Sequence, residues 1–166
     1  MNVNLKIKNQ SFRFMIISLF LLPIMILGNK NNDGSIISGE LKVDTVLDTT
    51  SGPWTVVGTI TIPENITLTI EPGVTVYFKS GKKIIVEKDG CLCAVGNAEN
   101  KILMTRKKGT NSHWGGIYFN STMKDNQLCY VKMYYADYDK QSIFLDHSKL
   151  LIDNMKWNNH NKKILD

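Results

Sequence analysis

Short runs in which apolar and polar residues alternate dominate the chain after residue 29. The run 66–70, ITLTI, shows the pattern most plainly, because its apolar residues all fall on one side of an extended chain. Such alternation is typical of a β-strand with one buried face, and no stretch has the spacing of a long amphipathic helix. The pattern predicts short strands at 59–62, 66–70, 74–78, 83–87, 91–95, 102–105 and 117–119.

Turn residues separate these strands. Pro, Gly, Asn and Asp fill the breaks, as in Pro72-Gly73 and Asp89-Gly90. Two all-β architectures fit strands this short: an antiparallel sandwich or barrel, and a β-solenoid in which each turn bends the chain around a coil. The breaks are mostly not the Asn-Gly or Gly-Gly pairs of tight hairpins.

A weak internal repeat favours the solenoid. The segment that begins at Gly73 recurs at Gly90, and the segment that begins at Ile84 recurs at Ile102. The two spacings are nearly equal, and a short repeat that drifts slightly fits coils with variable turns.

In a solenoid the inward members of each alternating run form a continuous core. Each inward position is expected to stack on its equivalent in the next coil. The interior is therefore predicted to consist of Ile60, Ile62, Ile66, Leu68, Ile70, Val74, Val76, Phe78, Ile84, Val86, Leu92, Ala94, Ile102 and Met104.

Four motifs in a fixed order give the chain a family resemblance. They are TITIPENITLTIEPGVTVYF at 59–78, GCLCAVGNAENKILMT at 90–105, WGGIYF at 114–119 and LCYVKMYYA at 128–136. Together they resemble the coils of right-handed parallel β-helix proteins of the pectin-lyase-like class, found among secreted and cell-surface bacterial proteins. Asn97 and Lys101 depart from the family's usual Thr and Pro.

The resemblance implies an all-β fold, a right-handed parallel β-helix of about five short coils. It covers residues 52–136, about half of the chain. It implies no single activity, because this fold hosts lyases, hydrolases and non-catalytic surface proteins.

Several residues of these motifs are expected to shape the coils. Pro72 and Gly73 make a sharp turn, since Pro fixes φ and Gly admits a positive φ. Gly115 and Gly116 either let the backbone approach the Trp114 ring or form a flexible turn. The resemblance implies further structural roles for Gly90, Gly96 and Asn154.

The N-terminal segment 1–28 has the form of an export signal. Residues 1–13 carry three basic residues and no acid, and residues 14–27 form an uncharged apolar run before Gly28. This order is typical of a secretory signal peptide, although an uncleaved membrane anchor remains an alternative. We therefore expect the protein to be secreted or to reside in the cell envelope.

The chain is thereby divided into a signal peptide (1–28), a lead-in and N-terminal cap (29–54) and a parallel β-helix (55–166). Trp54 is a candidate plug for the open end of the first coil, because an uncapped coil exposes its core and strand edges. At the other end two readings stay open. Either residues 155–166 cap the helix, with Met155 and Trp157 in the core, or the chain is the front part of a longer protein.

Charge excludes one class of partner once the signal is set aside. The whole chain has 20 basic and 15 acidic residues and a net charge of +5. Without residues 1–28 it has 17 basic and 15 acidic residues, so the net charge falls to +2. A near-neutral chain lacks the basic footprint of a nucleic-acid-binding protein, and no nucleic-acid partner is expected.

The three cysteines leave their pairing open. Cys91 and Cys93 point outward together if Leu92 and Ala94 point inward, and their spacing on one strand disfavours a bond between them. One of them pairs with Cys129, or all three are free thiols. A metal site made from Cys-x-Cys and a histidine is a third, weaker reading, because zinc ligands usually come as paired clusters.

Candidate binding residues gather in the last third of the chain. Asp137, Tyr138 and Asp139 alternate, so both carboxylates can share a face and hold a sugar or a cation beside a tyrosine ring. The alternative is a solvated turn. No catalytic residue is expected, because no nucleophile signature accompanies the isolated histidines His113, His147 and His160.

Two functions fit these observations. The leading one is a secreted or surface β-helix module with a structural or interaction role, which contacts a polysaccharide or a cell-surface protein and needs no cofactor or metal. The alternative is a carbohydrate-active enzyme, a polysaccharide lyase or glycosidase, acting on the lateral face. For that alternative the resemblance implies acidic residues that hold Ca²⁺ and an Arg or Lys base; Arg106 is the only arginine after the signal.

Overall fold

The computed structural model describes residues 34–137 and 141–158. Over these residues the chain consists of strands and turns, as the alternating pattern predicts. The signal segment 1–28, Tyr138, Asp139 and His160 lie outside the described residues. The strands are β1 (Ser35–Glu40), β2 (Thr45–Leu47), β3 (Trp54–Ile62), β4 (Thr67–Ile70), β5 (Thr75–Phe78), β6 (Ile84–Val86), β7 (Cys91–Val95), β8 (Ile102–Arg106), β9 (Ile117–Asn120), β10 (Asn126–Cys129), β11 (Val131–Tyr134), β12 (Ile143–Asp146), β13 (Leu150–Asp153) and β14 (Lys156–Asn158).

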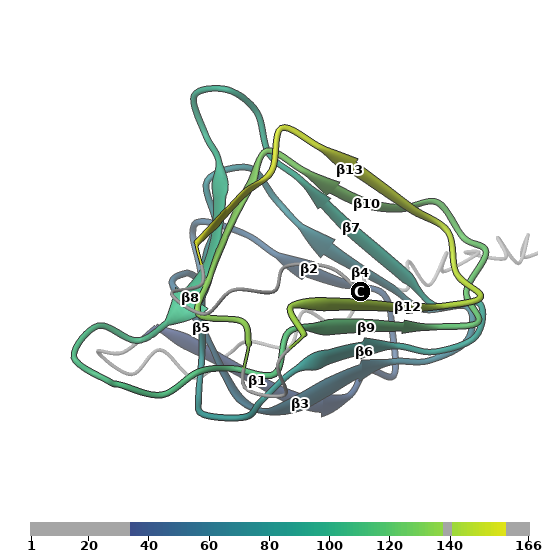
Figure 1. The fold of residues 1–166 in the computed structure, drawn as a ribbon, viewed down its shortest axis with the longest axis horizontal. Coiled ribbons are helices and arrows are strands. Elements are labelled where there is room, and N and C mark those ends of the chain that lie inside the picture. The colour runs from purple at the N-terminus through teal and green to yellow at the C-terminus, as the bar shows by residue number, and fades with distance from the viewer. Residues whose placement is uncertain (1–33, 138–140, 159–166) are drawn as a thin grey trace, which may run out of the picture.

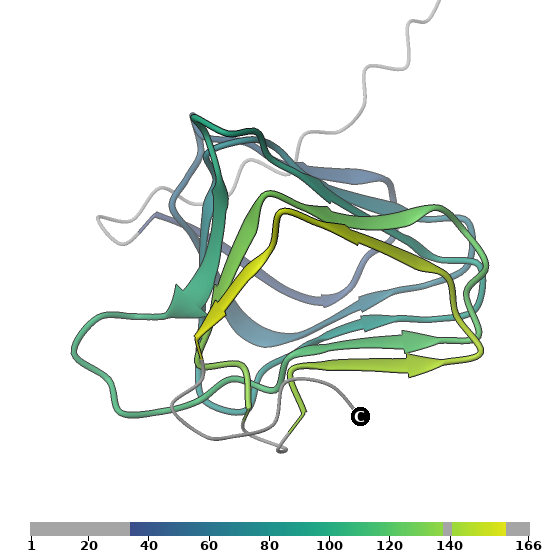
Figure 2. The same ribbon diagram turned by 45° about the horizontal axis from the view of Figure 1, so that its top comes forward.

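The strands form three faces of a parallel solenoid. Face A contains β2, β4, β7, β10 and β13. Face B contains β5, β8, β11 and β14, and face C contains β6, β9 and β12. The long strand β3 turns the corner between faces B and C, because Trp54–Val56 pair with β5 and Ile60–Ile62 pair with β6. Seen down the solenoid, the faces enclose a triangular section (Figures 1 and 2).

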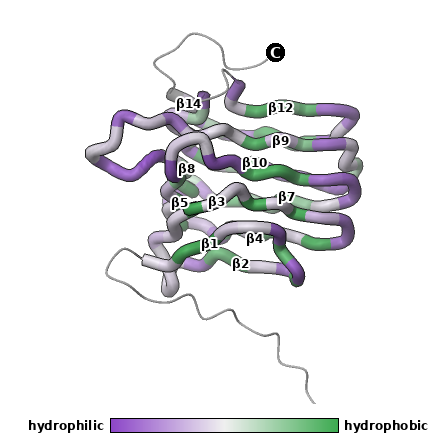
Figure 3. Tube along the Cα trace, turned by 90° about the horizontal axis from the view of Figure 1, so that it is seen from below, coloured by the Kyte–Doolittle hydropathy of each residue, from purple (hydrophilic) through white to green (hydrophobic). Residues whose placement is uncertain are grey.

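The expected fold is confirmed: the chain is a right-handed-type parallel β-solenoid of about five coils. Every strand pairs in parallel with the strand above or below it, so segments far apart in sequence lie side by side. Figure 3 shows the stacked coils from the side, with hydrophobic strands and hydrophilic corners.

Each turn of the solenoid contains more residues than the repeat that the sequence suggests. The partner of Trp54 in the next coil is Val76, and the partner of Cys93 is Gln127. Both intervals exceed the one from Gly73 to Gly90, and they differ from each other. The recurrence of Ile84 at Ile102 instead compares face C with face B. The repeat length was wrong because all three faces carry the same inward apolar pattern, so neighbouring faces resemble each other as closely as successive coils do.

The expected core is confirmed in its composition. All of the predicted interior residues are buried, except Ile66, which is partly buried and packs against the core. Burying one such aliphatic side chain stabilises the fold by about 1.5–3 kcal/mol. Equivalent positions stack in columns along the solenoid, such as Ile60, Ile84, Ile117 and Ile143.

The first coil begins before residue 55. Residues 35–47, expected as part of a lead-in and cap, form β1 and β2, which pair in parallel with β3 and β4. Trp54 is buried at the start of β3, between Ser35 of β1 and Val76 of β5. Its indole nitrogen donates a hydrogen bond to the carbonyl of Asp48 (2.9 Å). Trp54 therefore packs between layers of the solenoid, above the first coil.

Several corners need backbone conformations that few residues adopt. At the corner between faces C and A, Asn65, Asp89, Ser121 and His147 each have a positive φ, between 44° and 61°. These left-handed residues reverse the chain once in each coil. Two of the expected turn residues behave in the same way: Gly73 has a φ of 82° and Asn154 a φ of 48°.

Close approach between coils explains three of the expected glycines. A Cβ atom on Gly116 would lie 2.3 Å from the carbonyl oxygen of Ser142 in the next coil, and one on Gly90 would lie 2.5 Å from that of Ile62. A Cβ atom on Gly96 would lie 2.9 Å from the carbonyl oxygen of Asn100 and 3.0 Å from that of Tyr130 in the next coil. Any other residue would push these neighbouring backbones apart.

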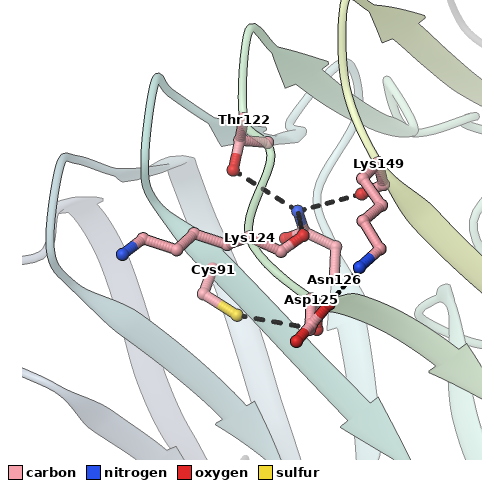
Figure 4. A network of polar contacts seen from close by, with 6 residues as sticks. All are labelled: Cys91, Thr122, Lys124, Asp125, Asn126 and Lys149. Carbon is pink, nitrogen blue, oxygen red and sulfur yellow. Dashed lines mark hydrogen bonds and ion pairs between the residues drawn. The ribbon is translucent and has the colours of Figure 1, made fainter.

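A buried amide ties three coils together at the corner between faces C and A (Figure 4). The Oδ1 atom of Asn126, which begins β10, accepts a hydrogen bond from the backbone N–H of Leu92 in the preceding coil (2.8 Å). Its Nδ2 group donates to the carbonyl of Lys149 in the following coil (3.1 Å) and to Oγ1 of Thr122 (3.4 Å). Thr122 in turn donates to the carbonyl of Gly90 (2.6 Å). Side chains thus form hydrogen bonds with backbone groups that have no backbone partner at this turn.

Candidate functional site

A long loop, residues 107–116, leaves the corner between faces B and C after β8 (Figure 2). Trp114 anchors its return into the core. The indole is fully buried and stacks on Phe78, with ring centroids 3.9 Å apart and planes 11° apart. Its Nε1 atom donates a hydrogen bond to the carbonyl of Tyr134 (2.8 Å). Trp114 therefore holds its neighbours in the loop at a fixed position beside the core, although the loop itself is polar.

His113 and Asp137 meet at this corner. Nδ1 of His113 is in hydrogen-bond contact with Oδ1 of Asp137. The Asp137 side chain is 4% exposed and the His113 side chain is 26% exposed. The imidazole also lies edge-on to the Tyr135 ring, with centroids 5.8 Å apart. The buried carboxylate holds the orientation of the ring and leaves Nε2 outside the pair.

Arg106 covers the same tyrosine from another side. Its guanidinium carbon lies 3.8 Å from the centroid of the Tyr135 ring, a cation–π contact. Its Nη1 atom donates a hydrogen bond to the carbonyl of Ser112 (3.3 Å), which joins the end of β8 to the loop. The planar cation is therefore fixed on the corner by the ring below it and by the loop.

A second cation–π pair lies next to this corner, on the outer side of face C. The ammonium group of Lys83 lies 4.4 Å from the centroid of the Tyr118 ring. Tyr118 pairs in register with Phe144 of the next coil, and their ring centroids are 5.6 Å apart. Lys83 is adjacent to the loop, because a Cβ atom on Gly115 would lie 3.0 Å from the Cβ of Lys83.

These contacts define two adjacent groups of side chains, which we together call the aromatic–basic surface. It spans faces B and C over successive coils and combines flat rings with fixed cations. Its members are Lys83, Arg106, His113, Tyr118, Tyr135 and Phe144.

Of the three expected ligand-binding residues, the described part of the chain contains one. Asp137, an expected ligand-binding residue, lies at its edge, but its carboxylate is buried against His113 rather than exposed. Tyr138 and Asp139, expected to bind beside it, lie outside the described residues. His113 is isolated in the sequence because its partner Asp137 lies far from it along the chain. Tyr118 and Phe144 come together only through the register pairing of β9 with β12. Their outward positions in equivalent strands were the signal that could have identified the pair.

The cysteines are free thiols, one of the readings left open by their spacing. Cys91 and Cys93 lie on β7 and are partly exposed, whereas Cys129 at the end of β10 is buried. Burial raises the pKa of the Cys91 and Cys129 thiols above the ordinary value of 9.0. The neutral thiol form is therefore favoured at both positions, which makes them weak nucleophiles.

The other groups of titratable side chains are less suited to form a functional site. His147 contacts Asp146 at 2.6 Å, but its side chain is 87% exposed and the pair lies on a solvated turn. Among the described residues, no three His, Cys, Asp or Glu side chains are grouped so that they could hold a metal ion. Residues 34–137 and 141–158 also contain no helix long and apolar enough to cross a membrane.

Comparison with known proteins gives one match. Residues 39–133 match the family model of the pectate-lyase-like beta helix domain, which is more than half of the chain. The matched residues run from β1 into β11 and include Arg106, His113 and Tyr118. The chain matches no curated protein and no solved structure.

Proposed function

Because the chain belongs to the family of pectate-lyase-like β-helix domains, we propose that it is a binding module that holds a glycan on its aromatic–basic surface without cleaving it. Sugar rings present flat C–H faces that stack on aromatic side chains, and hydroxyl or carboxylate groups that accept hydrogen bonds from cations. On this surface two cations lie over tyrosine rings, and Phe144 of the next coil adjoins Tyr118. A glycan chain is the ligand class that suits this arrangement best.

One observation carries this proposal: two cations of the surface are each held in place over a tyrosine ring, from where they can donate hydrogen bonds to a sugar. Arg106 lies over Tyr135 and Lys83 over Tyr118. Glycosidases instead use two carboxyl groups, about 5–10 Å apart, that flank the scissile bond. The carboxylate placed at this surface, that of Asp137, is buried and engaged by His113. The described part of the surface is therefore better suited to holding a sugar than to protonating its leaving group.

We extend the proposal to location and partners. The basic and apolar order of residues 1–28 supports export, so the partner is a polysaccharide or a surface protein that carries one. N-terminal sequencing of the protein recovered from the cell envelope or the medium tests this. A start at or near residue 29 supports export, whereas recovery of intact Met1 from the cytoplasm contradicts it.

A second function, a carbohydrate-active enzyme, is favoured by a different observation. An imidazole oriented by a buried carboxylate is a common general base, and Arg106 lies on the same corner. In such an enzyme Nε2 of His113 would take a proton from the sugar, and Arg106 would stabilise the developing negative charge. This alternative predicts cleavage products, which a binding module does not form.

The binding proposal is tested by affinity electrophoresis through gels that contain pectate, alginate or an uncharged glucan. We expect retardation by at least one polysaccharide. Tyr118→Ala and Arg106→Ala should each weaken that binding about tenfold, the loss of roughly one stacking or cation contact. Lys88→Ala removes an exposed cation at the corner between faces C and A and should bind like the unaltered protein. Equal retardation of all four proteins would contradict the proposed surface.

A further inference from the structure

The buried pair of His113 and Asp137 fixes where the imidazole carries its proton. The Asp137 side chain is 4% exposed, and its Oδ1 atom is in hydrogen-bond contact with Nδ1 of His113. An ionised carboxylate only accepts hydrogen bonds, and a carboxyl group gives up its proton more readily than an imidazolium does. The proton between them therefore belongs to Nδ1, which donates to the carboxylate. A neutral imidazole carries one proton, so Nε2 is left as a hydrogen-bond acceptor.

The exposed part of the imidazole is the part that carries Nε2. The His113 side chain is 26% exposed, although its partner carboxylate is almost fully buried. The bond between Nε2 and Cδ2 lies opposite Nδ1 in the ring, so turning Nδ1 toward the buried carboxylate turns Nε2 toward the surface. Within residues 34–137 and 141–158, Nε2 of His113 has no hydrogen-bond partner. An oriented acceptor is thus presented to a ligand.

Backbone hydrogen bonds hold His113 between two other coils. Its carbonyl accepts a hydrogen bond from the N–H of Gly81 in the preceding coil (2.9 Å). The next residue, Trp114, donates its N–H to the carbonyl of Tyr135 in the following coil (2.9 Å). The acceptor therefore has a fixed position before a ligand arrives, which reduces the entropy that is lost on binding.

Arg106 provides hydrogen-bond donors near this acceptor. Its guanidinium carbon lies 3.8 Å from the centroid of the Tyr135 ring, and the centroid of the His113 ring lies 5.8 Å from the same point. A guanidinium group has five N–H donors, and Nη1 of Arg106 donates to the carbonyl of Ser112. An acceptor and several donors are therefore held around one tyrosine ring.

We propose that His113 selects a ligand group that donates a hydrogen bond to Nε2, and that this group is a sugar hydroxyl. A carboxylate, a sulfate ester or a methyl ether has no proton to donate, so each would meet the lone pair of Nε2 without forming a hydrogen bond. A neighbouring oxygen of the same sugar accepts a hydrogen bond from Arg106. The inference rests on the proposed glycan-binding function and names the sugar group that the surface recognises.

The two residues of the pair have different roles. His113 touches the ligand, whereas Asp137 is a positioning residue that acts through the imidazole. In Asp137→Asn no negative charge holds the proton on Nδ1, and the amide can donate its own hydrogen bond to that nitrogen. The ring proton then resides on Nε2, which becomes a donor. A hydroxyl and a methyl ether can both accept from this donor, so the preference for the hydroxyl is lost.

Nuclear magnetic resonance of the ¹⁵N-labelled full chain tests the position of the proton without any ligand. At about pH 8, where an unperturbed imidazole is neutral, long-range ¹H–¹⁵N correlations distinguish a protonated ring nitrogen from an unprotonated one. We expect His113 to have a protonated Nδ1 and an unprotonated Nε2, and this order to be reversed in Asp137→Asn. His113→Phe identifies the resonances. A proton on Nε2 of the unaltered protein would overturn the inference, whether or not a glycan binds.

Affinity electrophoresis tests the ligand group, with a polysaccharide that retards the protein and with the methyl ether of the same polysaccharide. We expect the methyl ether to bind at least tenfold more weakly, the loss of roughly one hydrogen bond or more. The ratio of the two affinities should fall at least fivefold in His113→Phe and in Asp137→Asn. His147→Phe, a change on an exposed turn, is the matched control and should keep the ratio of the unaltered protein.

The outcomes separate this inference from the function on which it rests. An unchanged ratio in His113→Phe would overturn the role given to Nε2 and leave glycan binding intact. Absence of retardation by every polysaccharide would contradict the proposed function, and with it the ligand assigned to Nε2.

Discussion

Single residues of this solenoid are constrained by what lies directly above and below them. Gly90 and Gly116 are placed where a neighbouring coil leaves no room for a Cβ atom. Asn126 is placed where neighbouring coils present an N–H and a carbonyl group to one fully buried amide. Each constraint comes from a residue far away in the sequence, and each fixes one residue type.

Replacing the buried amide should therefore cost more than its size suggests. Asn126→Ala leaves the N–H of Leu92 and the carbonyl of Lys149 without their partner, and we expect the free energy of unfolding to fall by about 2–4 kcal/mol. The neighbouring Gln127→Ala, at an outward position, should change it by less than about 0.5 kcal/mol. Urea denaturation of the two variants measures the difference, and equal midpoints would show that the amide does not tie the coils together.

At the scale of strands and turns, alternation predicted much of what the structure contains. The expected strands 66–70 and 91–95 correspond to β4 and β7, because the inward apolar residues also define the buried face. β1 and β2 were missed as strands, since few apolar residues mark them and their pairing with β3 and β4 holds them in place. His113 and Asp137 were not predicted as a pair, because loops of different lengths bring them together and no local spacing records this.

The turn between β2 and β3 should make stability depend on acid. The N–H of Ser51 and the hydroxyl of Thr50 donate to Asp48 and lower the pKa of its carboxyl below the ordinary value of 3.8. A carboxyl group with a lowered pKa in the folded state stabilises that state above pH 3.8, and the stabilisation is lost as the pH falls through the folded-state pKa. Asp48→Asn should therefore be less stable at pH 7, by about 0.5 kcal/mol for a turn open to solvent.

This prediction is checked by thermal unfolding of both proteins between pH 7 and pH 2. The two unfolding curves should converge as the pH falls below 3.8. Thr49→Ala, an exposed change in the same turn, is the control and should show no such convergence. A gap between Asp48→Asn and the unaltered protein that stays constant down to pH 2 would contradict the role given to the carboxylate.

At the scale of the whole molecule, the coils separate what holds the fold from what contacts a partner. Inward positions form one apolar column after another, and this pattern is what the sequence revealed. Outward positions are free of that requirement, so the corner between faces B and C can carry rings and cations. The proposed function depends on outward residues from several coils, and their combination becomes visible only when the register is known.

If the aromatic–basic surface holds a glycan intact, a polysaccharide incubated with the protein keeps its length, and product analysis measures this. A polysaccharide that the protein binds is incubated with an equimolar amount of protein, and chain length and new sugar ends are then measured. We predict an unchanged polymer that remains bound, and loss of binding in Tyr118→Ala. Shortened chains produced by the unaltered protein, and absent with His113→Ala, would contradict the claim and identify a carbohydrate-active enzyme.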